Sequence, residues 1–213
     1  MRLFSAIWET LFPYIKKCVV CGTEKAVTDY LCPTCGLAMH KLTADRADAQ
    51  CACAAYLYDD PAARIVQRYK YGGSRYLAGF MAQAMLRASI EAQISFDYVC
   101  HVPLHKKKRR KRGFDQASLL AQRLAELTGK PHIDAIKRIR NTPSQTRLNS
   151  QQRKENMRGA FEAVQSVSGR VLLVDDVFTT GATAAECAGV LKEAGAAEVT
   201  VLTFARAKDP TAQ

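Results

Sequence analysis

The sequence contains no apolar run approaching the ~20 residues that a membrane-spanning helix needs. The patterns GxGxxG, GxxxxGK[ST] and GxSxG are also absent, and there is no internal repeat. The first 15 residues are apolar on average, but they include Glu9 and Pro13 and are followed by no small-x-small cleavage motif. We therefore expect a packed helix there rather than a signal peptide, with membrane-surface association as the alternative. A cytoplasmic location follows, with contact at the inner face of the membrane left open.

Acidic residues are missing from the two most basic segments. Residues 105–112 read HKKKRRKR and contain no acid, and residues 137–158 hold seven Lys and Arg against Glu155 alone. Together these segments carry more than the whole net charge of +11, because the remaining residues sum to a slightly negative charge. Charge gathered in this way predicts a polyanionic ligand, either phosphates on a small molecule or a nucleic-acid backbone. The alternative is a pair of solvated charged loops.

Cysteines are present in two regularly spaced pairs, Cys18-x-x-Cys21 and Cys32-x-x-Cys35. In a reducing compartment such pairs bind metal more often than they form disulfides, and two CxxC knuckles complete a Cys₄ site for structural Zn²⁺. Gly22 and Gly36 follow the second cysteine of each pair, as the tight turn of a knuckle requires. Four free thiols and a redox CxxC are the alternatives.

Other potential ligands are given no metal-binding role. Cys51 and Cys53 form a CxC that cannot act as a knuckle, so we expect structural thiols that lie close to the module. His40 follows at a distance that would reach the zinc site, but four cysteines already suffice. His101 falls in a predicted strand, where a histidine is usually a hydrogen-bonded core residue.

The hydrophobic pattern predicts an α/β fold with a partly parallel sheet. We expect two units: residues 1–54, with the N-terminal helix and the zinc module, and residues 55–213, the main domain. Strands are predicted over 52–58, 98–102, 171–174 and 199–204. Helices are predicted over 61–69, 76–92, 115–128, where Asp115 is the N-cap, and about 182–194. Residues 139–157 are polar and basic and predict one long mobile loop.

The segment Asp175 to Thr183 follows a predicted strand and precedes a predicted helix, with the sequence DDVFTTGAT. In an open parallel sheet, ligands bind at this position. Threonine hydroxyls, a glycine and the free amides of the helix start form a phosphate cradle. Two adjacent carboxylates beside it suit a ligand that also carries hydroxyls or Mg²⁺. A ribose 5-phosphate has both features; a plain strand-turn-helix with capping threonines is the alternative.

The sequence VLLVDDVFTTGAT, residues 171–183, resembles the signature of type I phosphoribosyltransferases, which bind 5-phosphoribosyl-1-pyrophosphate (PRPP). The resemblance implies that Asp175 and Asp176 contact the ribose hydroxyls and act as the catalytic acids. It implies that the 5-phosphate is held by Thr179, Thr180, Gly181, Ala182 and Thr183. Mg²⁺ would accompany the PRPP pyrophosphate.

Three further segments resemble the ComF/GntX group of phosphoribosyltransferase-like proteins. They are YKYGGSRYLA from Tyr69, VPLHKKKRRKRGFDQASLLAQRLA from Val102 and RNTPSQTRLNSQQRKENMRGAF from Arg140, and the CxxC pairs complete the pattern. The resemblance implies a role in natural competence, the uptake of single-stranded DNA, with competence proteins such as a DNA translocase as partners. An active phosphoribosyltransferase that releases pyrophosphate to an unknown acceptor is the alternative, and a PRPP-sensing regulator is a third.

The same resemblance gives the basic segments roles. Pyrophosphate would bind after the strand that ends at Val102, at Pro103, Leu104, His105 and Lys106. Residues 139–157 would close over PRPP and bring Arg140, Arg147 and Arg153 to the pyrophosphate. The surplus charge would bind single-stranded DNA without sequence preference. The residues expected in that contact are Lys107, Lys108, Arg109, Arg110, Lys111 and Arg112.

Overall fold

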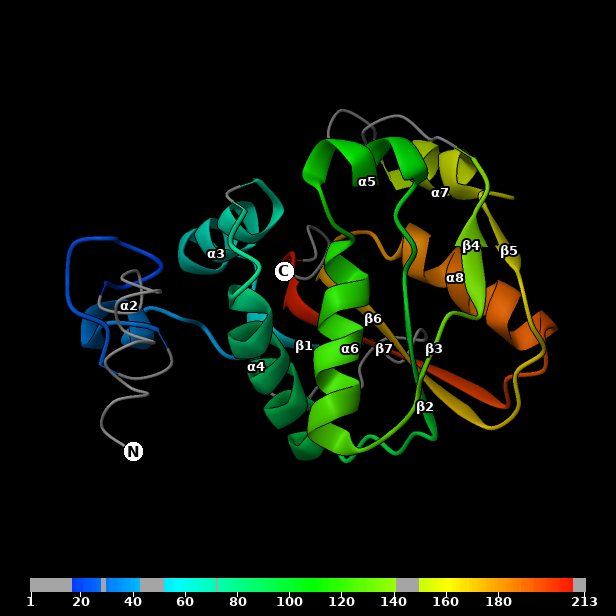
Figure 1. Ribbon diagram of the computed structural model, residues 1–213, viewed down its shortest axis with the longest axis horizontal. Coiled ribbons are helices and arrows are strands. Elements are labelled where there is room, and N and C mark those ends of the chain that lie inside the picture. Colours follow the sequence, from blue (N-terminus) through cyan, green and yellow to red (C-terminus); the bar gives the residue numbers. More distant parts are fainter. Residues whose placement is uncertain (1–16, 28–29, 43–51, 72, 141–149, 209–213) are drawn as a thin grey trace.

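The computed structural model describes residues 17–27, 30–42, 52–71, 73–140 and 150–208. Its centre is a five-stranded sheet in the order β1-β7-β6-β2-β3 (Figure 1). Every pair of neighbouring strands in this sheet is parallel. The strands are β1 (Ala52–Leu57), β2 (Tyr98–His101), β3 (His132–Ile133), β6 (Arg170–Phe178) and β7 (Glu198–Arg206).

Helices pack on both faces of the sheet, as a parallel sheet requires. On one face lie α4 (Leu77–Glu91) and α6 (Gln116–Thr128), with α3 (Asp60–Tyr71) beside them (Figure 1). On the other lie α8 (Ala182–Glu193) and an antiparallel ribbon of β4 (Ile136–Arg138) and β5 (Phe161–Ala163). Each face has its own apolar core, centred on residues such as Phe80 and Phe204 in one and Leu173 and Leu191 in the other.

The unit β6–α8–β7 confirms the expected strand-helix-strand pattern. β6 and β7 are hydrogen-bonded along their length, from Arg170 opposite Glu198 to Phe178 opposite Arg206. Helix α6 also begins where its sequence predicts, because the Asp115 side chain accepts a hydrogen bond from the Ser118 amide and caps the helix. The spacing of Ala117, Leu120, Ala121, Leu124 and Leu127 predicts one apolar face for this helix; the first four are buried, but Leu127 is 45% exposed.

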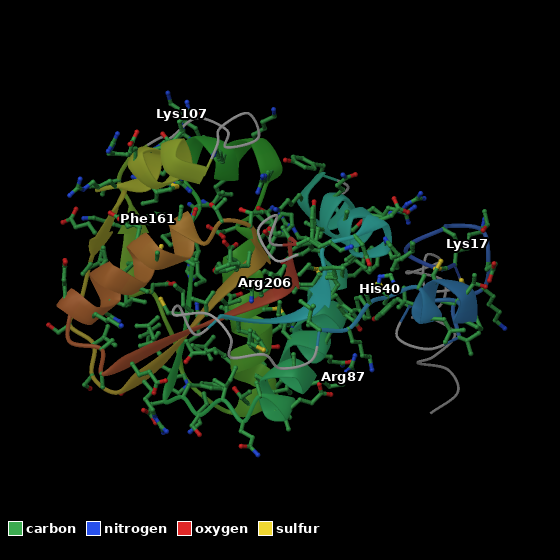
Figure 2. All side chains as sticks on the ribbon, turned by 180° about the vertical axis from the view of Figure 1, so that it is seen from behind. Lys17, His40, Arg87, Lys107, Phe161 and Arg206 are labelled. Carbon is green, nitrogen blue, oxygen red and sulfur yellow. The ribbon has the colours of Figure 1, made fainter. Side chains whose placement is uncertain are left out.

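The cysteine-rich module packs against the α4 side of the main domain and contains α2 (Pro33–Leu37). Tyr30 contacts the rings of Tyr76 and Phe80, with centroids 6.3 and 6.2 Å away. Residues 40–42 then run antiparallel along the free edge of β1: the Leu57 amide donates to the His40 carbonyl, and the Leu42 amide to that of Ala55. His40 lies at the junction of the two parts (Figure 2).

Two expectations from the sequence need correction here. The last part of the predicted loop is a helix, α7 (Ser150–Met157). It forms without an apolar stripe because Gln, Arg, Lys and Glu have high helix propensity. The run after His105 is also helical, as α5 (Lys106–Arg112).

Several expectations stay as predictions. The helix over residues 1–15, Cys51 and residues 141–149 lie outside the described residues, and the mobility of the 139–157 segment stays a prediction. Strand β1 spans the boundary drawn between residues 54 and 55, so the sheet includes residues from Ala52 onward. In the part of the chain that the structure describes, no helix has both the length and the apolarity to cross a membrane.

Candidate functional site

A cleft of about 420 Å³ opens at the carboxyl ends of β2, β6 and β7. Its walls are the turn after β2, the end of β6 with the following loop, and the starts of α6 and α8. Side chains from the last turn of α3, from α5 and from β4 complete it. This is the edge at which parallel α/β sheets bind their ligands.

The acid pair lies in this cleft, but in a strand rather than in the expected loop. β6 continues to Phe178 because Asp175, Val177 and Phe178 still pair with β7. Successive side chains of a strand point to opposite faces. Asp176 therefore faces α3, where it pairs with Lys70. Asp175 points to the opposite face, where its charge interacts with the Arg138 guanidinium. The loop begins only at Thr179.

Lys70, in the last turn of α3, compensates Asp176. Its Nζ lies 2.8 Å from Asp176 Oδ1, and the two side chains are 20% and 9% exposed. Burial lowers the pKa of Lys70, but the charge of Asp176, its hydrogen bond to the ammonium and the charge of Asp175 together raise that pKa above its ordinary value, so the ammonium stays charged. No role for Lys70 was assigned from the sequence; the only local signal is a lysine between Tyr69 and Tyr71 before a glycine pair.

Asp175 is less well compensated. Burial and, next, the charge of Asp176 raise its pKa to about 7, and the more distant Lys70 offsets this only in part. Its Oδ1 accepts a hydrogen bond of 2.8 Å from the Asp176 amide. The cleft thus holds one carboxylate in an ion pair and one carboxyl group that titrates near neutral pH.

The loop from Thr179 to Thr183 has the features of an anion site. Gly181 adopts a φ of 70°, and no side chain caps the helix α8 that begins after it. The first amides of a helix lack intrahelical acceptors, so they are available to an anion. The Thr180 hydroxyl is buried and has no hydrogen-bond partner among the described residues. A bound phosphate would supply the hydrogen-bond partner that this hydroxyl lacks.

Cations line the opposite part of the cleft wall. Lys108 and Arg112 are one turn apart on α5, and Arg138 comes from β4. Burial, together with the positive charges of Arg138 and Arg112, lowers the pKa of Lys108. Arg112 is held in place by Gln116 Oε1 at 2.9 Å and by the Tyr71 ring at 5.2 Å. Mutual repulsion of these cations would be relieved by a bound anion.

Helix α5 divides the expected DNA-contacting residues into two faces. Lys108 and Arg112 line the cleft, whereas Lys107, Arg109, Arg110 and Lys111 are exposed. Lys107 projects away from the molecule (Figure 2). The sequence did not indicate this division because the run was not predicted to be a helix.

The candidate pyrophosphate residues are only partly brought together. Pro103 and Leu104 line the cleft, but His105 caps α5 and Lys106 is exposed, and neither lines it. Arg140 is exposed and donates to the Arg158 carbonyl at 2.7 Å. Arg147 and the side chain of Arg153 lie outside the described residues. Lys70 and Arg138 are the cleft cations that sequence reasoning missed.

A second candidate site is the cluster of Cys18, Cys21, Cys32 and Cys35, whose sulfurs all lie within 4.8 Å of one another. Each CxxC forms a turn, with the Gly22 amide donating to the Cys18 carbonyl and the Gly36 amide to that of Cys32, both at 2.8 Å. Only Gly22, with a φ of 72°, uses the conformational freedom expected of both glycines, because Gly36 lies inside α2. Four thiolates at this spacing fit one tetrahedral metal ion such as zinc.

Known proteins are similar to this chain in sequence over most of their length. The chain is 34% identical to the DNA utilization protein YhgH of Salmonella typhimurium over 203 residues, 89% of both chains. It is 31% identical to competence protein F of Haemophilus influenzae over 160 residues, 70% of both chains. No family model matches the sequence.

Among solved structures, that of the allosteric regulatory enzyme of purine biosynthesis is similar to 64% of this chain, with 26% identity and a TM-score of 0.42; the chain spans 29% of its length. The fold is a mostly parallel sheet with helices on both faces, preceded by a module with four clustered cysteines. With 31–34% identity to relatives over most of their length, the chain belongs to the ComF/GntX family of phosphoribosyltransferase-like proteins.

Proposed function

We propose that the cleft binds PRPP together with Mg²⁺. The observation that carries the proposal is the buried Thr180 hydroxyl, which has no hydrogen-bond partner in the part of the chain that the structure describes and lies just before α8, a few residues after two cleft-lining carboxyl groups. In this proposal the loop from Thr179 to Thr183 holds the 5-phosphate. Asp175 and Asp176 accept hydrogen bonds from the ribose hydroxyls and are the candidate catalytic acids.

The cationic wall supports binding of the pyrophosphate end. Lys108, Arg112 and Arg138 all line the cleft and carry positive charge close to one another. Pro103 and Leu104 belong to the same proposed subsite, and His105, Lys106, Arg140, Arg147 and Arg153 remain predicted contributors. Mg²⁺ usually binds through substrate phosphates and one or two carboxylates. A bound cation would stabilise the ionised form of Asp175, which, unlike Asp176, has no ion pair with Lys70. The ion would neutralise charge on the pyrophosphate.

Calorimetric titration of Mg²⁺–PRPP into the wild type and into Asp175→Ala/Asp176→Ala tests this proposal. We expect binding by the wild type and a loss of affinity of at least about tenfold in the double variant, since two ribose contacts disappear. A control variant, Asp60→Ala/Glu126→Ala, removes two exposed carboxylates outside the cleft and should bind like the wild type. A folded wild type that binds no PRPP, or equal binding by both variants, would exclude the proposal.

We also propose a role in the handling of single-stranded DNA, as in natural competence. The relatives named competence protein F and DNA utilization protein support this, as do the exposed cations of α5. Phosphate contacts by Lys and Arg give affinity without sequence preference. Other competence proteins, such as a DNA translocase, are proposed partners in the cytoplasm or at the inner face of the membrane.

An active phosphoribosyltransferase is the second candidate, favoured by the three cations of the cleft wall. In that reaction the bond from ribose C1 to the pyrophosphate oxygen breaks, and a lone pair of the acceptor forms the new bond to C1. Fixed cations would stabilise the charge that gathers on the leaving pyrophosphate. Release of pyrophosphate with PRPP and an added acceptor distinguishes this candidate from a protein that only binds PRPP.

For the cysteine module we propose structural Zn²⁺. Four protein ligands complete a tetrahedral shell, so no position remains for a substrate. The buried sulfurs of Cys18 and Cys32 lie in the same apolar core as the α4 side chains. The ion would therefore support packing rather than chemistry.

A further inference from the structure

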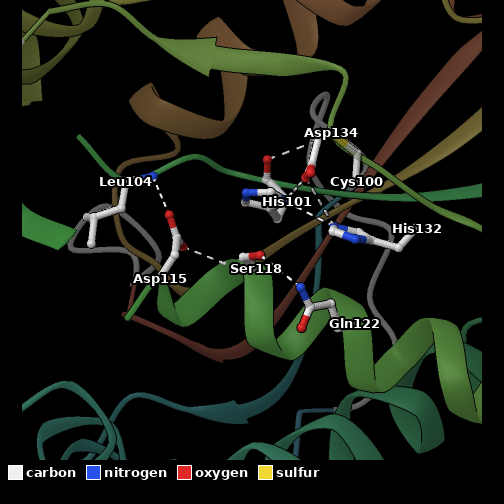
Figure 3. A network of polar contacts seen from close by, with 8 residues as sticks. All are labelled: Cys100, His101, Leu104, Asp115, Ser118, Gln122, His132 and Asp134. Atoms are coloured by element: carbon white, nitrogen blue, oxygen red, sulfur yellow. Dashed lines mark hydrogen bonds and ion pairs between the residues drawn. The ribbon is translucent and has the colours of Figure 1, made fainter. Parts of the chain in front are cut away.

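Two histidines and an aspartate converge at the edge of the sheet, in a group that neither the cleft nor the cysteine module includes. His101 Nδ1 lies 3.1 Å from His132 Nε2 and 3.5 Å from Asp134 Oδ1, and His132 Nε2 lies 3.7 Å from the same oxygen (Figure 3). The three side chains come from β2, from β3 and from the residues that join β3 to β4.

The strand register explains why they meet. Val99 pairs with His132, and Cys100 pairs with Ile133, so the next residues along the two parallel strands are His101 and Asp134. Because side chains alternate between faces, Val99 and His101 share a face, as do His132 and Asp134. The strands therefore direct His101 and His132 to one face, and Asp134, the first residue after β3, reaches the same point.

The distances fit a metal ion. Zn²⁺ binds histidine nitrogens and carboxylate oxygens at about 2.0–2.2 Å, so ligand atoms around a tetrahedral ion lie about 3.3–3.6 Å apart. The three separations, 3.1, 3.5 and 3.7 Å, lie close to that range. Three facing ligand atoms thus already form one face of a coordination tetrahedron.

Burial divides the group into a fixed part and an accessible part. The His101 and His132 side chains are 10% and 16% exposed, whereas Asp134 is 77% exposed. The rings are tilted by 34°, with centroids 5.3 Å apart, so both present a nitrogen to the same point without stacking. The two mostly buried imidazoles would bind an ion from the protein side, and the exposed Asp134 carboxylate would bind it from the solvent side. The fourth coordination position would also face solvent.

We propose that His101, His132 and Asp134 form a second metal site, for a divalent transition ion such as Zn²⁺. Two imidazoles and one carboxylate favour this class of ion over Mg²⁺ or Ca²⁺, which prefer oxygen ligands. Three protein ligands and one open position distinguish the site from the closed Cys₄ cluster. An ion here would link the end of β2 to β3 directly before Val102, where the cleft wall begins.

The competing arrangement is a hydrogen bond between the two rings, in which one ring N–H donates to the nitrogen of the other. In that arrangement the three side chains bind no metal ion. Cobalt spectroscopy separates the two cases, because Co²⁺ held by thiolates shows intense charge-transfer absorption that Co²⁺ held by histidine and carboxylate does not.

The full-length protein, carrying zinc in its cysteine cluster, would be titrated with Co²⁺. We expect one Co²⁺ to bind without thiolate absorption, and we expect His132→Ala and Asp134→Asn each to lower that affinity at least about tenfold. Since Asp134 is exposed, Asp134→Asn gives the answer even if His132→Ala does not fold. His40→Ala removes a histidine outside the group and should bind like the wild type.

Three results would overturn the proposal. They are a wild type that binds no further Co²⁺, Co²⁺ binding that carries thiolate absorption, and unchanged affinity in a folded Asp134→Asn.

Discussion

At the scale of single residues, the neighbouring carboxyl groups of β6 have unlike environments. Asp176 is neutralised by Lys70 at 2.8 Å, whereas burial and the charge of Asp176 raise the pKa of Asp175 to about 7. The ionised form of such a buried carboxyl group destabilises the folded protein, and a ligand or cation that binds the carboxylate offsets this loss. The acid pair is thus better suited to binding than to stability.

The stability of Asp175→Asn should reveal this cost. The pKa of Asp175 in the folded protein lies above its ordinary value of 3.8, so between pH 4 and 7 the folded state keeps a proton that the unfolded state loses. Wild-type stability therefore falls over this window relative to the variant, and the difference stays constant above pH 7. We expect Asp175→Asn to be more stable at pH 8 by on the order of 2 kcal/mol, and by much less at pH 4.

Urea unfolding at both pH values measures the difference. Asp60→Asn, which changes the charge equally at an exposed position of α3, is the control. A stability difference between Asp175→Asn and the wild type that is the same at both pH values would contradict the raised pKa.

The residues of the candidate site were predictable to the extent that their signal is local. Asp175 to Thr183 are contiguous, so strand, acids, glycine and helix start are all visible in one short segment. Lys70 and Arg138 reach the cleft from far along the chain, and no local pattern marks a lysine that pairs with an acid some hundred residues later. The pairing of His101 with His132 was hidden for the same reason, because it depends on the register of two strands.

At the scale of elements, α5 shows how a run of seven cations can be helical. Lys and Arg have high intrinsic helix propensity, although like charges one turn apart repel. The His105 side chain accepts from the Lys107 amide at the start, and Gly113 ends the helix with a φ of 79°. Cations in the last turn also interact favourably with the helix dipole. The cap and the glycine are sequence signals that the charges obscured.

The two faces of α5 should separate two binding activities. Replacing four exposed cations with Gln (Lys107, Arg109, Arg110 and Lys111) should weaken single-stranded DNA binding at low salt by at least about tenfold. It should also reduce the slope of log affinity against log salt by up to about 3, since each phosphate contact contributes about 0.7. PRPP affinity should be retained, because these side chains do not line the cleft.

The matched variant is Lys108→Gln/Arg112→Gln, which changes the cleft face of the same helix. It should lower PRPP affinity while leaving most of the salt-dependent DNA binding, measured by fluorescence anisotropy. If both variants lose DNA binding in proportion to the charge removed, α5 does not have separate faces in solution.

Elements with strong apolar periodicity followed the sequence closely, whereas polar ones did not. α6 and the β6–α8–β7 unit lie where an apolar face or run predicts them. α7 and α5 have almost no apolar residues, so hydrophobic periodicity had nothing to detect. The end of β6 was missed because two acids and a valine do not read as a strand; only pairing with β7 extends it to Phe178.

At the scale of the whole molecule, the cysteine module is part of the α/β core. Cys18, Cys32 and Leu31 belong to the same buried cluster as Tyr69 and Phe80. The division into residues 1–54 and 55–213 therefore remains a prediction about the chain, while the described residues pack as one continuous core on that side. Disorder in the module would expose apolar surface of α4.

Loss of the ion proposed for the cysteine cluster should for this reason destabilise the entire protein. Cys32→Ser/Cys35→Ser, or treatment with a strong chelator, should lower the melting temperature of the α/β part by at least about 5 °C, since a loss of 1 kcal/mol corresponds to about 2–4 °C for a chain of this size. Calorimetry would follow the transition, and Cys53→Ala, outside the cluster, is the control. An unchanged main transition would mean that the module unfolds independently.

The pairing of residues 40–42 with β1 has a consequence for solubility. β1 is an outer strand of the sheet, and an uncovered outer strand offers its backbone groups to other chains. Residues 40–42 occupy that side of β1, and at the opposite border β3 is only two residues long. We therefore expect the cysteine module to protect β1 from pairing with strands of other molecules. If residues 40–42 detach, the backbone groups of β1 become available for such pairing, and self-association would then depend on the metal content of the module.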